Sequence, residues 1–448
     1  MDGHEITNED LVEQCQKILV NNDFVTHTVP SSKFYPHQWL WDSAFISIGI
    51  SHYNPKRAAE ELVGLFKGQW HNGMLPNIIF DSAPEYAADR SAWRSWVSRN
   101  SPDNIATTGI TQPPVVAEAV QRVGQKLAAS DRKIFYKKLV PKIIKYHEWI
   151  YSERDPHNNG LAILINPYET GMDNTPPWMD QLREHSRPVW IATIENLKMD
   201  KFINVARRDT RRLSTSQRMT NIDALMLWDA VTRLRKKRYD INKILHRQLF
   251  AIEDIGFNAI LVRNNSILEE LATESRVKIN PDTINNFRKT EEAIEELWDE
   301  TYAVYLSRDF VTGKKMRSPT IASLLPIYSR KINKDHLEKL VRVLTNEHSF
   351  WLRYPVPSVP RNFRTFDQNR YWQGPTWINT NWLLIDGLMH TGHEEIANKL
   401  IAKTIRLAKE SGIWEYYNPH NGMGLGSKDF SWSAALILDL LKREPSNY

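Results

Sequence analysis

The sequence predicts an all-α fold, in which one helical domain carries long loops over one of its ends. Most apolar residues recur at the spacing of an amphipathic helix, and convincing strands with alternating apolar residues are nearly absent. Long stretches rich in Trp, Pro, Gly and Asn interrupt the helices, but no linker divides residues 1–448 into independent domains. With 41% hydrophobic residues, the chain has enough apolar material for a large core. The loop stretches are His71–Pro114, Asn166–Met219, Tyr354–Gly374 and Gly412–Phe430.

The helices are expected, in chain order, wherever apolar residues recur every three or four positions. Residues 115–127 show this pattern with valines and a leucine, and residues 134–150 show it again. Pro141 is expected to kink the second of these helices or to divide it in two. About a dozen helical segments follow from this pattern. The others include 222–261 (two or three helices), 267–272, 291–297, 321–328, 393–408 and 431–441.

Local signals add one strand, one helix cap and a set of aromatic helix starts. Ala162–Ile165 is the best candidate for a short strand. Thr391 and Glu394 have the spacing of a capping box before the helix at 393–408. Several aromatic and polar loops run directly into an apolar helix, which brings rings and free backbone N–H groups together. If these starts converge, they build an aromatic-lined pocket; they are Phe34–Phe45, Asn369–Trp377 and Lys428–Trp432.

Bulk properties exclude several classes of protein. Met1–Asp10 is charged and has no apolar run, so no signal peptide is expected, and no stretch approaches the roughly 18 apolar residues of a membrane helix. Cys15 is the single cysteine, which excludes an internal disulfide and favours a cytoplasmic location. The net charge of +5 is a weak bias, and Arg233–Arg238 continues a helical pattern as a solvated face. No nucleic-acid recognition motif accompanies this cluster.

The chain lacks the signatures of several common chemistries. It has no phosphate-cradling loop, no dinucleotide fingerprint and no nucleophile elbow, so no cofactor is expected. Its 14 histidines form no metal-binding pair or dense cluster, so no metal is expected. What remains is a mixture of aromatic rings, carboxylates and amides in loops. Such a mixture suits a carbohydrate, because rings stack on the apolar faces of sugars while polar groups bind hydroxyls; the alternative is simple packing of tryptophans.

Five motifs, in order along the chain, point to a family. They are Trp39–Phe45 (WLWDSAF), His71–Pro76 (HNGMLP), Asn166–Trp178 (NPYETGMDNTPPW), Tyr371–Trp377 (YWQGPTW) and Trp414–Gly426 (WEYYNPHNGMGLG). The third resembles the general-acid segment of family 63 of the glycoside hydrolases, and the fifth resembles its general-base segment. The first and the fourth resemble its two other sugar-site motifs, and the second resembles a further loop of the family. The resemblance covers nearly the whole chain and is greatest to the bacterial and archaeal glucosylglycerate and mannosylglycerate hydrolases.

The resemblance implies an (α/α)6 barrel, with a cap built from loops at about 66–114 and 166–219. It also implies an inverting mechanism with Asp173 as general acid and Glu415 as general base, about 6.5–9.5 Å apart so that a water fits between them. The apolar residues around Asp173 would raise its pKa, as an acid requires. Asp173 could instead bond its own backbone in a turn, and Glu415 could form a loop salt bridge. Glu169 is a rival carboxylate that orients its loop or binds a sugar hydroxyl.

The same resemblance suggests a sugar-binding set around the two carboxyl groups. Asp42 is expected to bind hydroxyls, although it could simply cap a helix beginning at Ser43. Glycines 422, 424 and 426 are expected to let the backbone near Glu415 approach a ligand closely. Some of the aromatic residues are expected to belong to the core rather than to the pocket. The remaining candidates are Tyr35, Trp39, Trp41, His71, Gln112, Trp178, Tyr371, Trp372, Trp377 and Trp432.

The leaving group is assigned from the expected cap. A glycerate leaving group carries a negative charge and requires a cation, preferably the forked guanidinium of an arginine. Arg207–Arg218 holds five arginines, of which Arg218 best matches the family's carboxylate-binding position. Tyr86 is the expected hydroxyl partner from the other cap loop. The alternative is that these arginines, including the Arg207–Arg212 run, are surface charges.

The sequence therefore predicts an inverting α-glycosidase that releases the hexose and glycerate from α-glucosylglycerate or α-mannosylglycerate. A second hypothesis keeps the enzyme and changes the substrate to a neutral α-glucoside such as trehalose or an oligosaccharide. A third is a sugar-binding helical barrel without catalysis. The expected partner is a small glycoside, with no nucleic acid and no membrane. A homo-oligomer stays open, because loops this long often pack against neighbouring copies.

Overall fold

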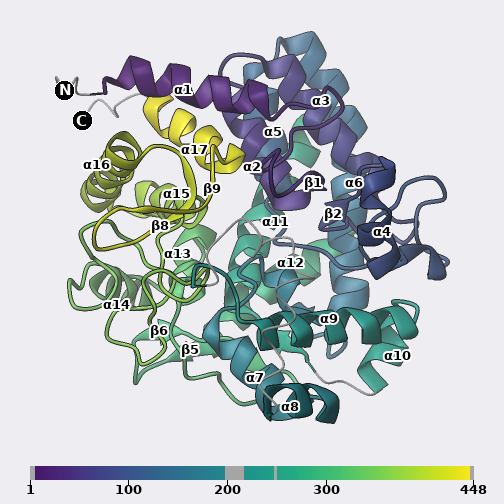
Figure 1. Ribbon diagram of the computed structural model, residues 1–448. Coiled ribbons are helices and arrows are strands. Elements are labelled where there is room, and N and C mark those ends of the chain that lie inside the picture. The colour runs from purple at the N-terminus through teal and green to yellow at the C-terminus, as the bar shows by residue number, and fades with distance from the viewer. Residues whose placement is uncertain (1–5, 197–215, 247–249, 444–448) are drawn as a thin grey trace.

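Helices pair into an inner and an outer set in the computed structural model, which describes residues 6–196, 216–246 and 250–443 (Figure 1). Each inner helix packs against the next along the chain, and the last packs against the first. Nearly every residue of the first and last inner helices is buried, as expected for helices that are apolar on all sides. The inner helices are α2 (Leu40–Ile50), α5 (Val116–Lys126), α11 (Ile255–Ser275), α13 (Pro326–Ser329), α15 (Ile378–Met389) and α17 (Ser431–Lys442).

The outer helices are amphipathic and bury one face in the core. In α14, for example, Leu337, Leu340, Val341 and Leu344 are buried while the residues between them are not. Helix α1 lies beside α17, so the first and last described helices are neighbours (Figure 1). The outer helices are α1 (Asn8–Asn21), α3 (Pro55–Leu65), α6 (Ala129–Arg154), α12 (Pro281–Ala293), α14 (Lys334–Leu344) and α16 (Glu394–Ser411).

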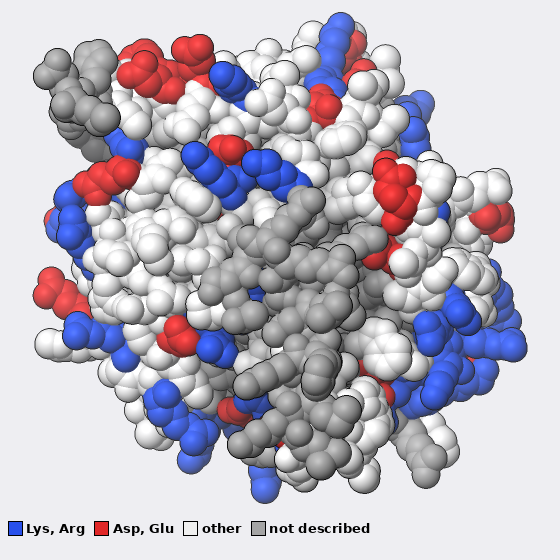
Figure 2. Space-filling model, viewed as in Figure 1, with Lys and Arg blue, Asp and Glu red and all other residues white. Residues whose placement is uncertain are grey.

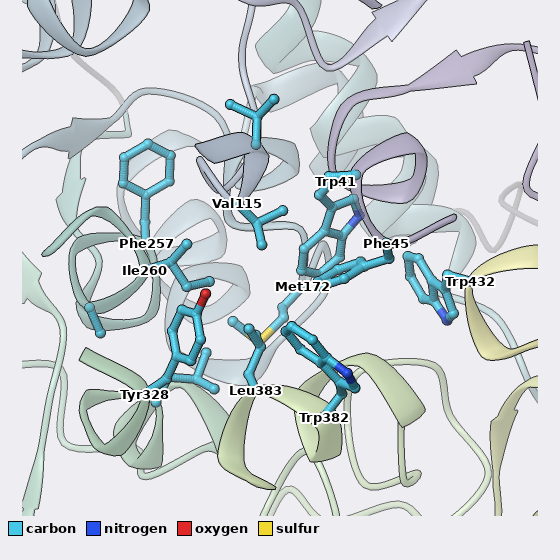
Figure 3. Close-up of a cluster of buried hydrophobic side chains, with 14 of the residues drawn as sticks. Trp41, Phe45, Val115, Met172, Phe257, Ile260, Tyr328, Trp382, Leu383 and Trp432 are labelled. Atoms are coloured by element: carbon cyan, nitrogen blue, oxygen red, sulfur yellow. The ribbon is translucent and has the colours of Figure 1, made fainter. Parts of the chain in front are cut away.

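The core lies where the inner helices face one another. Figure 3 shows side chains from α2, α11, α13, α15 and α17 pointing toward a common centre. Met172 joins them from a loop and is 1% exposed. Since Asp173 follows Met172 directly, the core fixes the backbone on which that carboxyl group stands.

Two of the segments expected to be long loops contain short helices. Figure 1 shows most of these helices together at the lower end of the molecule, and α4, α7 and α8 each pack on α9. Helix α9 begins where Thr220 accepts a hydrogen bond from the Asp223 backbone N–H (3.1 Å). The additional helices are α4 (Ala87–Trp93), α7 (Pro176–Ser186), α8 (Val189–Asn196), α9 (Asn221–Lys236) and α10 (Ile241–His246), with short 3-10 turns at 66–68, 84–86, 95–97, 167–170, 294–297 and 321–324.

Short antiparallel strands connect the helices. The strand expected at Ala162–Ile165 is confirmed as β3 (Ile163–Leu164), in a three-stranded sheet with β4 (Ile252–Glu253) and β7 (Arg308–Asp309). The sequence pattern missed the hairpin of β8 (Trp414–Tyr417) and β9 (Gly424–Lys428), because both strands are short and β9 contains two glycines. The other pairs are β1 (Gln38–Trp39) with β2 (Ile78–Ile79), and β5 (Trp298–Asp299) with β6 (Val304–Tyr305).

One local prediction is wrong, and two alternatives are excluded. Of the two alternatives for Pro141, division of the helix is excluded, because α6 continues through it from Ala129 to Arg154. Thr391 does not cap α16; its hydroxyl donates to the Gly387 carbonyl (3.0 Å) at the end of α15 instead. Asp42 is not a helix cap either, since α2 already begins at Leu40.

Within the described residues no helix is both long and apolar enough to cross a membrane. Lys and Arg gather where the C-terminal end of α9 meets α10 (Figure 2), and the last turn of α9 contributes Arg233, Arg235 and Lys236. Arg235 also binds the Ala92 carbonyl (2.8 Å), so the predicted solvated face in part supports α4. The Arg207–Arg212 run lies outside the described residues.

Candidate active site

Distant segments of the chain meet around a cavity of about 340 Å³, a volume typical of small-molecule sites. The segments are the start of α2 with β1, the loop before α5, the loop before α7, the segment that holds Arg218 and Met219, and the β8–β9 hairpin. Eight of the nineteen lining residues are aromatic, and six are polar or charged. The sequence-predicted residues that line the cavity are Tyr35, Trp39, Trp41, Asp42, Gln112, Asp173, Arg218, Tyr371, Glu415 and Trp432.

Asp173 stands on a loop that its neighbours hold rigidly. The Met172 carbonyl accepts hydrogen bonds from the indole N–H of Trp178 (3.0 Å) and from the hydroxyl of Thr175 (2.7 Å). Gly171 turns the chain with φ +70°, where an added Cβ would lie 2.6 Å from the Trp41 ring. Only glycine fits here, and the turn leads into Asp173 at the cavity wall.

The environment of Asp173 favours its protonated form. Burial raises its pKa from 3.8 to about 7, although the positive charge of Arg218 and a hydrogen bond from the Tyr371 hydroxyl (3.3 Å) both lower it. The negative charge of Glu415 also raises it. A carboxyl group that keeps its proton near neutral pH can act as a general acid.

Glu415 lies on β8 at an irregularity in the pairing with β9, between Trp414 and Tyr416. Its side chain is 2% exposed and is held at both oxygens. The Tyr35 hydroxyl donates to Oε1 (2.8 Å), and the Ser427 backbone N–H donates to Oε2 (2.9 Å). The bulge and these bonds aim the carboxylate into the cavity.

The glycines of this hairpin have a different role from the predicted one. None of them lines the cavity. A Cβ on Gly426 would lie 2.4 Å from Oε2 of Glu415, and one on Gly424 would lie 2.2 Å from the Trp414 ring. These glycines make room for side chains of their own hairpin and not for a ligand.

Arg218 joins the two walls of the cavity. It is 5% exposed, and Nη1 lies 3.2 Å from Oε1 and 3.4 Å from Oε2 of Glu415. Nη2 donates to the Tyr35 hydroxyl, and the guanidinium lies 4.4 Å from the centre of the Tyr371 ring. The preceding residue, Gln217, accepts hydrogen bonds at its carbonyl from the Tyr371 N–H (3.1 Å) and the Tyr416 hydroxyl (2.6 Å).

Other polar groups of the cavity are suited to bind hydroxyls. Asp42 is 3% exposed, and burial raises its pKa well above 3.8, with Glu415 and Asp173 adding to the rise. Oε1 of Gln112 and the indole N–H groups of Trp39 and Trp432 have no hydrogen-bond partner among the described residues. Buried polar groups cost free energy when they have no hydrogen-bond partner, so the binding of a polyol that pairs with them is favoured.

Four predicted site residues lie behind the cavity lining. Trp178 is fully buried and supports the Asp173 loop as described above. The rings of Trp372 and Trp377 stack on each other at 3.7 Å and are 1% exposed, so they form core beneath Tyr371. Glu169 is buried in an ion pair with Arg154 (2.7 Å) and accepts the Ile165 N–H (2.7 Å), which orients its loop.

Two further predicted residues lie away from the cavity. The His71 side chain is 56% exposed and faces Asp103 (3.7 Å). Tyr86 packs edge-on against His37 at 4.9 Å, near the surface. The motif beginning at His71 instead reaches the cavity just beyond its end, through Asn77 and Ile78.

Sequence reasoning missed part of the lining. Tyr168 and Gly171 lie inside a quoted motif, and Met219 follows Arg218, so proximity to these motifs was a usable signal. Trp93, at the end of α4, gave none, because only the packing of α4 on α9 brings it to the cavity. The missed lining residues are Pro30, Asn77, Ile78, Trp93, Tyr168, Gly171, Met219, Ala224 and Phe430.

The described residues contain no group of three or more His, Cys, Asp or Glu side chains placed to hold a metal ion. The cavity presents a carboxyl group with a pKa of about 7, a second carboxylate, a buried arginine and aromatic side chains. This set can donate a proton to one side of a bond and take one from a water on the other.

Comparison with known proteins identifies relatives over nearly the full chain. Residues 35–433 match the mannosylglycerate hydrolase MGH1-like glycoside hydrolase domain. A mannosylglycerate hydrolase of Thermus thermophilus is 35% identical over 429 residues, which cover 94% of this chain and 98% of the relative. A glucosylglycerate hydrolase of Mycolicibacterium hassiacum is 28% identical and covers 97% of this chain and 98% of the relative.

A solved structure agrees with these sequence relatives. The crystal structure of a family 63 mannosylglycerate hydrolase from Thermus thermophilus, in complex with Tris and D-glycerate, superposes with a TM-score of 0.85. It is 33% identical to this chain, and the match covers 96% of this chain and 99% of that one. The mostly helical fold of the two proteins is therefore the same.

Proposed function

The chain belongs to the MGH1-like glycoside hydrolase family, and we propose that it hydrolyses α-mannosylglycerate or α-glucosylglycerate to the free hexose and glycerate. It is a glycoside hydrolase. The observation that carries the choice of residues is that Asp173, with a pKa raised to about 7, and Glu415 line one cavity together with eight aromatic side chains.

The proposed reaction inverts the anomeric carbon. Asp173 gives its proton to the glycosidic oxygen as the C1–O bond breaks, and glycerate leaves with that proton on its hydroxyl. Glu415 takes a proton from a water whose oxygen bonds to C1 from the opposite face. Solvent then returns a proton to Asp173 and removes one from Glu415. Tyr371 and Tyr35 hold the two carboxyl groups through the hydrogen bonds described above.

We propose that Asp42, Gln112, Trp39, Trp41 and Trp432 form the sugar subsite. Their polar groups face hydroxyls and their rings cover the apolar face of the hexose. Arg218 is proposed to bind the glycerate carboxylate, since among the described residues it is the only Lys or Arg in the cavity lining.

The fold proposed for this activity is an (α/α)6 barrel that forms one catalytic domain over residues 1–448. The closed succession of packed inner helices supports it, and all of them except α13 also pack on an outer helix. The segments 66–114 and 166–219 are proposed to form the cap, which α4, α7 and α8 support where the structure describes them.

Two measurements test the proposal. The purified chain is incubated with mannosylglycerate, glucosylglycerate, trehalose and maltose, and the products are followed by NMR. The β-anomer of the hexose is expected to appear first from mannosylglycerate or from glucosylglycerate. Initial release of the α-anomer would refute inversion, and turnover of only the neutral glucosides would favour the second hypothesis.

The residue assignments need their own variants. Asp173→Asn and Glu415→Gln are each expected to lose about 10²–10⁴ in kcat while remaining folded. Near-normal turnover by either folded variant would overturn that assignment. Arg218→Ala is expected to weaken hydrolysis of the glycerates far more than that of neutral glucosides, and an equal loss on both would reject its carboxylate role.

A further inference from the structure

The guanidinium of Arg218 already binds a carboxylate, and that carboxylate is the proposed catalytic base. Nη1 contacts both oxygens of Glu415, at 3.2 and 3.4 Å, and the Tyr35 hydroxyl bridges the same two residues. Arg218 and Glu415 are both buried, with 5% and 2% exposure, so solvent does little to weaken this pair.

This pairing opposes both halves of the chemistry. The guanidinium occupies lone pairs of the Glu415 carboxylate where a water must bind. The same positive charge lowers the pKa of Asp173 and thereby favours loss of the proton that an acid must keep. While Arg218 remains on Glu415, lone pairs of the base are occupied and the acid holds its proton less tightly.

A glycerate carboxylate would compete with Glu415 for this guanidinium. Among the residues that the structure describes, no other Lys or Arg lines the cavity, so a charged leaving group and Glu415 share one cation. Resting on the proposed function, we infer that the leaving-group carboxylate draws Arg218 away from Glu415, so that the substrate's own charge switches on the acid–base pair. Arg218 thereby selects charged substrates in the turnover step as well as in binding.

The geometry around Arg218 permits such an exchange without unfolding the loop. The Gln217 carbonyl fixes the backbone through Tyr371 and Tyr416, while the guanidinium rests on the Tyr371 ring at 4.4 Å. A guanidinium has five N–H donors in a fork and can trade one carboxylate for another while it stays on the ring. The exchange leaves Glu415 without its cation, and the hydrogen bonds from the Tyr35 hydroxyl and the Ser427 backbone N–H then hold its charge.

The test separates the charge of the leaving group from the bond that breaks. An α-glycosyl fluoride of mannose or glucose has no glycerate. In its hydrolysis the water oxygen bonds to C1, the C1–F bond breaks, fluoride leaves with the bonding electrons, and Glu415 takes the water proton. Free D-glycerate can then occupy the leaving-group side of the cavity, and glycerol is the matched neutral control.

For the wild-type chain, D-glycerate is expected to raise kcat for fluoride hydrolysis about tenfold, within the 5–150-fold range of typical coupling between sites. Glycerol is expected to leave the rate unchanged. A lack of effect of D-glycerate, or inhibition at every concentration, would overturn the inference. Equal acceleration by glycerol and glycerate would overturn it as well, because the charge would then play no part.

Variants locate the effect. Arg218→Ala is expected to hydrolyse the fluoride without any response to glycerate, whereas Arg218→Lys keeps part of the response. Arg154→Gln is the matched control, because Arg154 is another buried arginine on a carboxylate, 2.7 Å from Glu169, outside the cavity lining. Its ratio of rates with and without glycerate is expected to equal that of the wild type. A full glycerate response in Arg218→Ala would contradict the inference.

Failure of this inference differs from failure of the proposed function. If the chain hydrolyses a hexosylglycerate but glycerate does not accelerate the fluoride reaction, the inference alone is wrong. If it hydrolyses neither hexosylglycerate, the proposed substrate is wrong whatever the fluoride shows.

Discussion

Replacing Asp173 with Asn is expected to stabilise the fold at alkaline pH while it removes turnover. The variant keeps a side-chain oxygen that can accept the Tyr371 hydrogen bond but can no longer ionise. In the wild type the folded state raises the pKa of Asp173 from 3.8 to about 7, mainly by burial. The folded chain therefore binds this proton more tightly than the unfolded chain does.

The sign and size of the expected stabilisation follow from this rise in the pKa of Asp173. The stability that protonated Asp173 contributes is fully present below pH 3.8 and is lost as pH rises through about 7. A pKa rise of about three units corresponds to a free-energy cost of about 4 kcal/mol for ionised Asp173 in the folded chain above pH 7, at about 1.36 kcal/mol per unit. Asp173 is half-buried and borders the cavity, so solvent reduces this figure, and we expect a gain of about 2–4 kcal/mol for Asn at pH 8.5.

The assay compares melting temperatures of wild type and variant from pH 4 to pH 8.5. For a chain of 448 residues, 1 kcal/mol corresponds to about 1 °C. The variant is expected to melt about 2–4 °C higher at pH 8.5 and to differ by less than about 1 °C at pH 4. Asp335→Asn, on the exposed start of α14, is the control and should show no growing difference. A difference for Asp173→Asn that does not grow with pH would refute the reasoning.

Two other predictions concern the same site. Turnover is expected to fall as pH rises through about 7, where Asp173 loses its proton. The Tyr371 hydroxyl lowers the pKa of Asp173, so Tyr371→Phe should raise that pKa and move the fall in turnover to higher pH. A fall at unchanged pH in the pH–rate profile of the variant would contradict this. Gly426→Ala is expected to cut kcat about 10²-fold, since its Cβ would lie 2.4 Å from Oε2 of Glu415 at a φ of +70°; wild-type kcat in a variant that folds normally would show that Glu415 tolerates displacement.

The helical periodicity and the aromatic motifs are local properties, and they led to correct conclusions. A helix that is apolar on all sides, such as α2 or α17, is buried wherever it packs, so its sequence suffices to place it in the core. The order of five motifs likewise indicated the family that the comparisons show. Each motif consists of consecutive residues, so the motif can be recognised without knowledge of the fold.

Roles within a motif were less predictable. Tyr371 and Trp372 are adjacent in one motif, yet Tyr371 lines the cavity while Trp372 stacks on Trp377 beneath it. Glu169 and Asp173 share another motif, but Arg154, from α6, neutralises Glu169 and leaves Asp173 to face the cavity. In each case a residue from elsewhere in the chain decides which neighbour is free to act.

The sequence by itself determined that the protein is a helical glycoside hydrolase and which two carboxyl groups are the catalytic candidates. Both conclusions rest on helical periodicity and on motifs, which are properties of nearby residues in the chain. Only the tertiary structure decided that Asp173 and Glu415 border one cavity, that burial gives Asp173 a pKa of about 7, and that Arg218 lies on Glu415. Burial and electrostatic pairing depend on atoms that distant segments bring together, and no local pattern contains them.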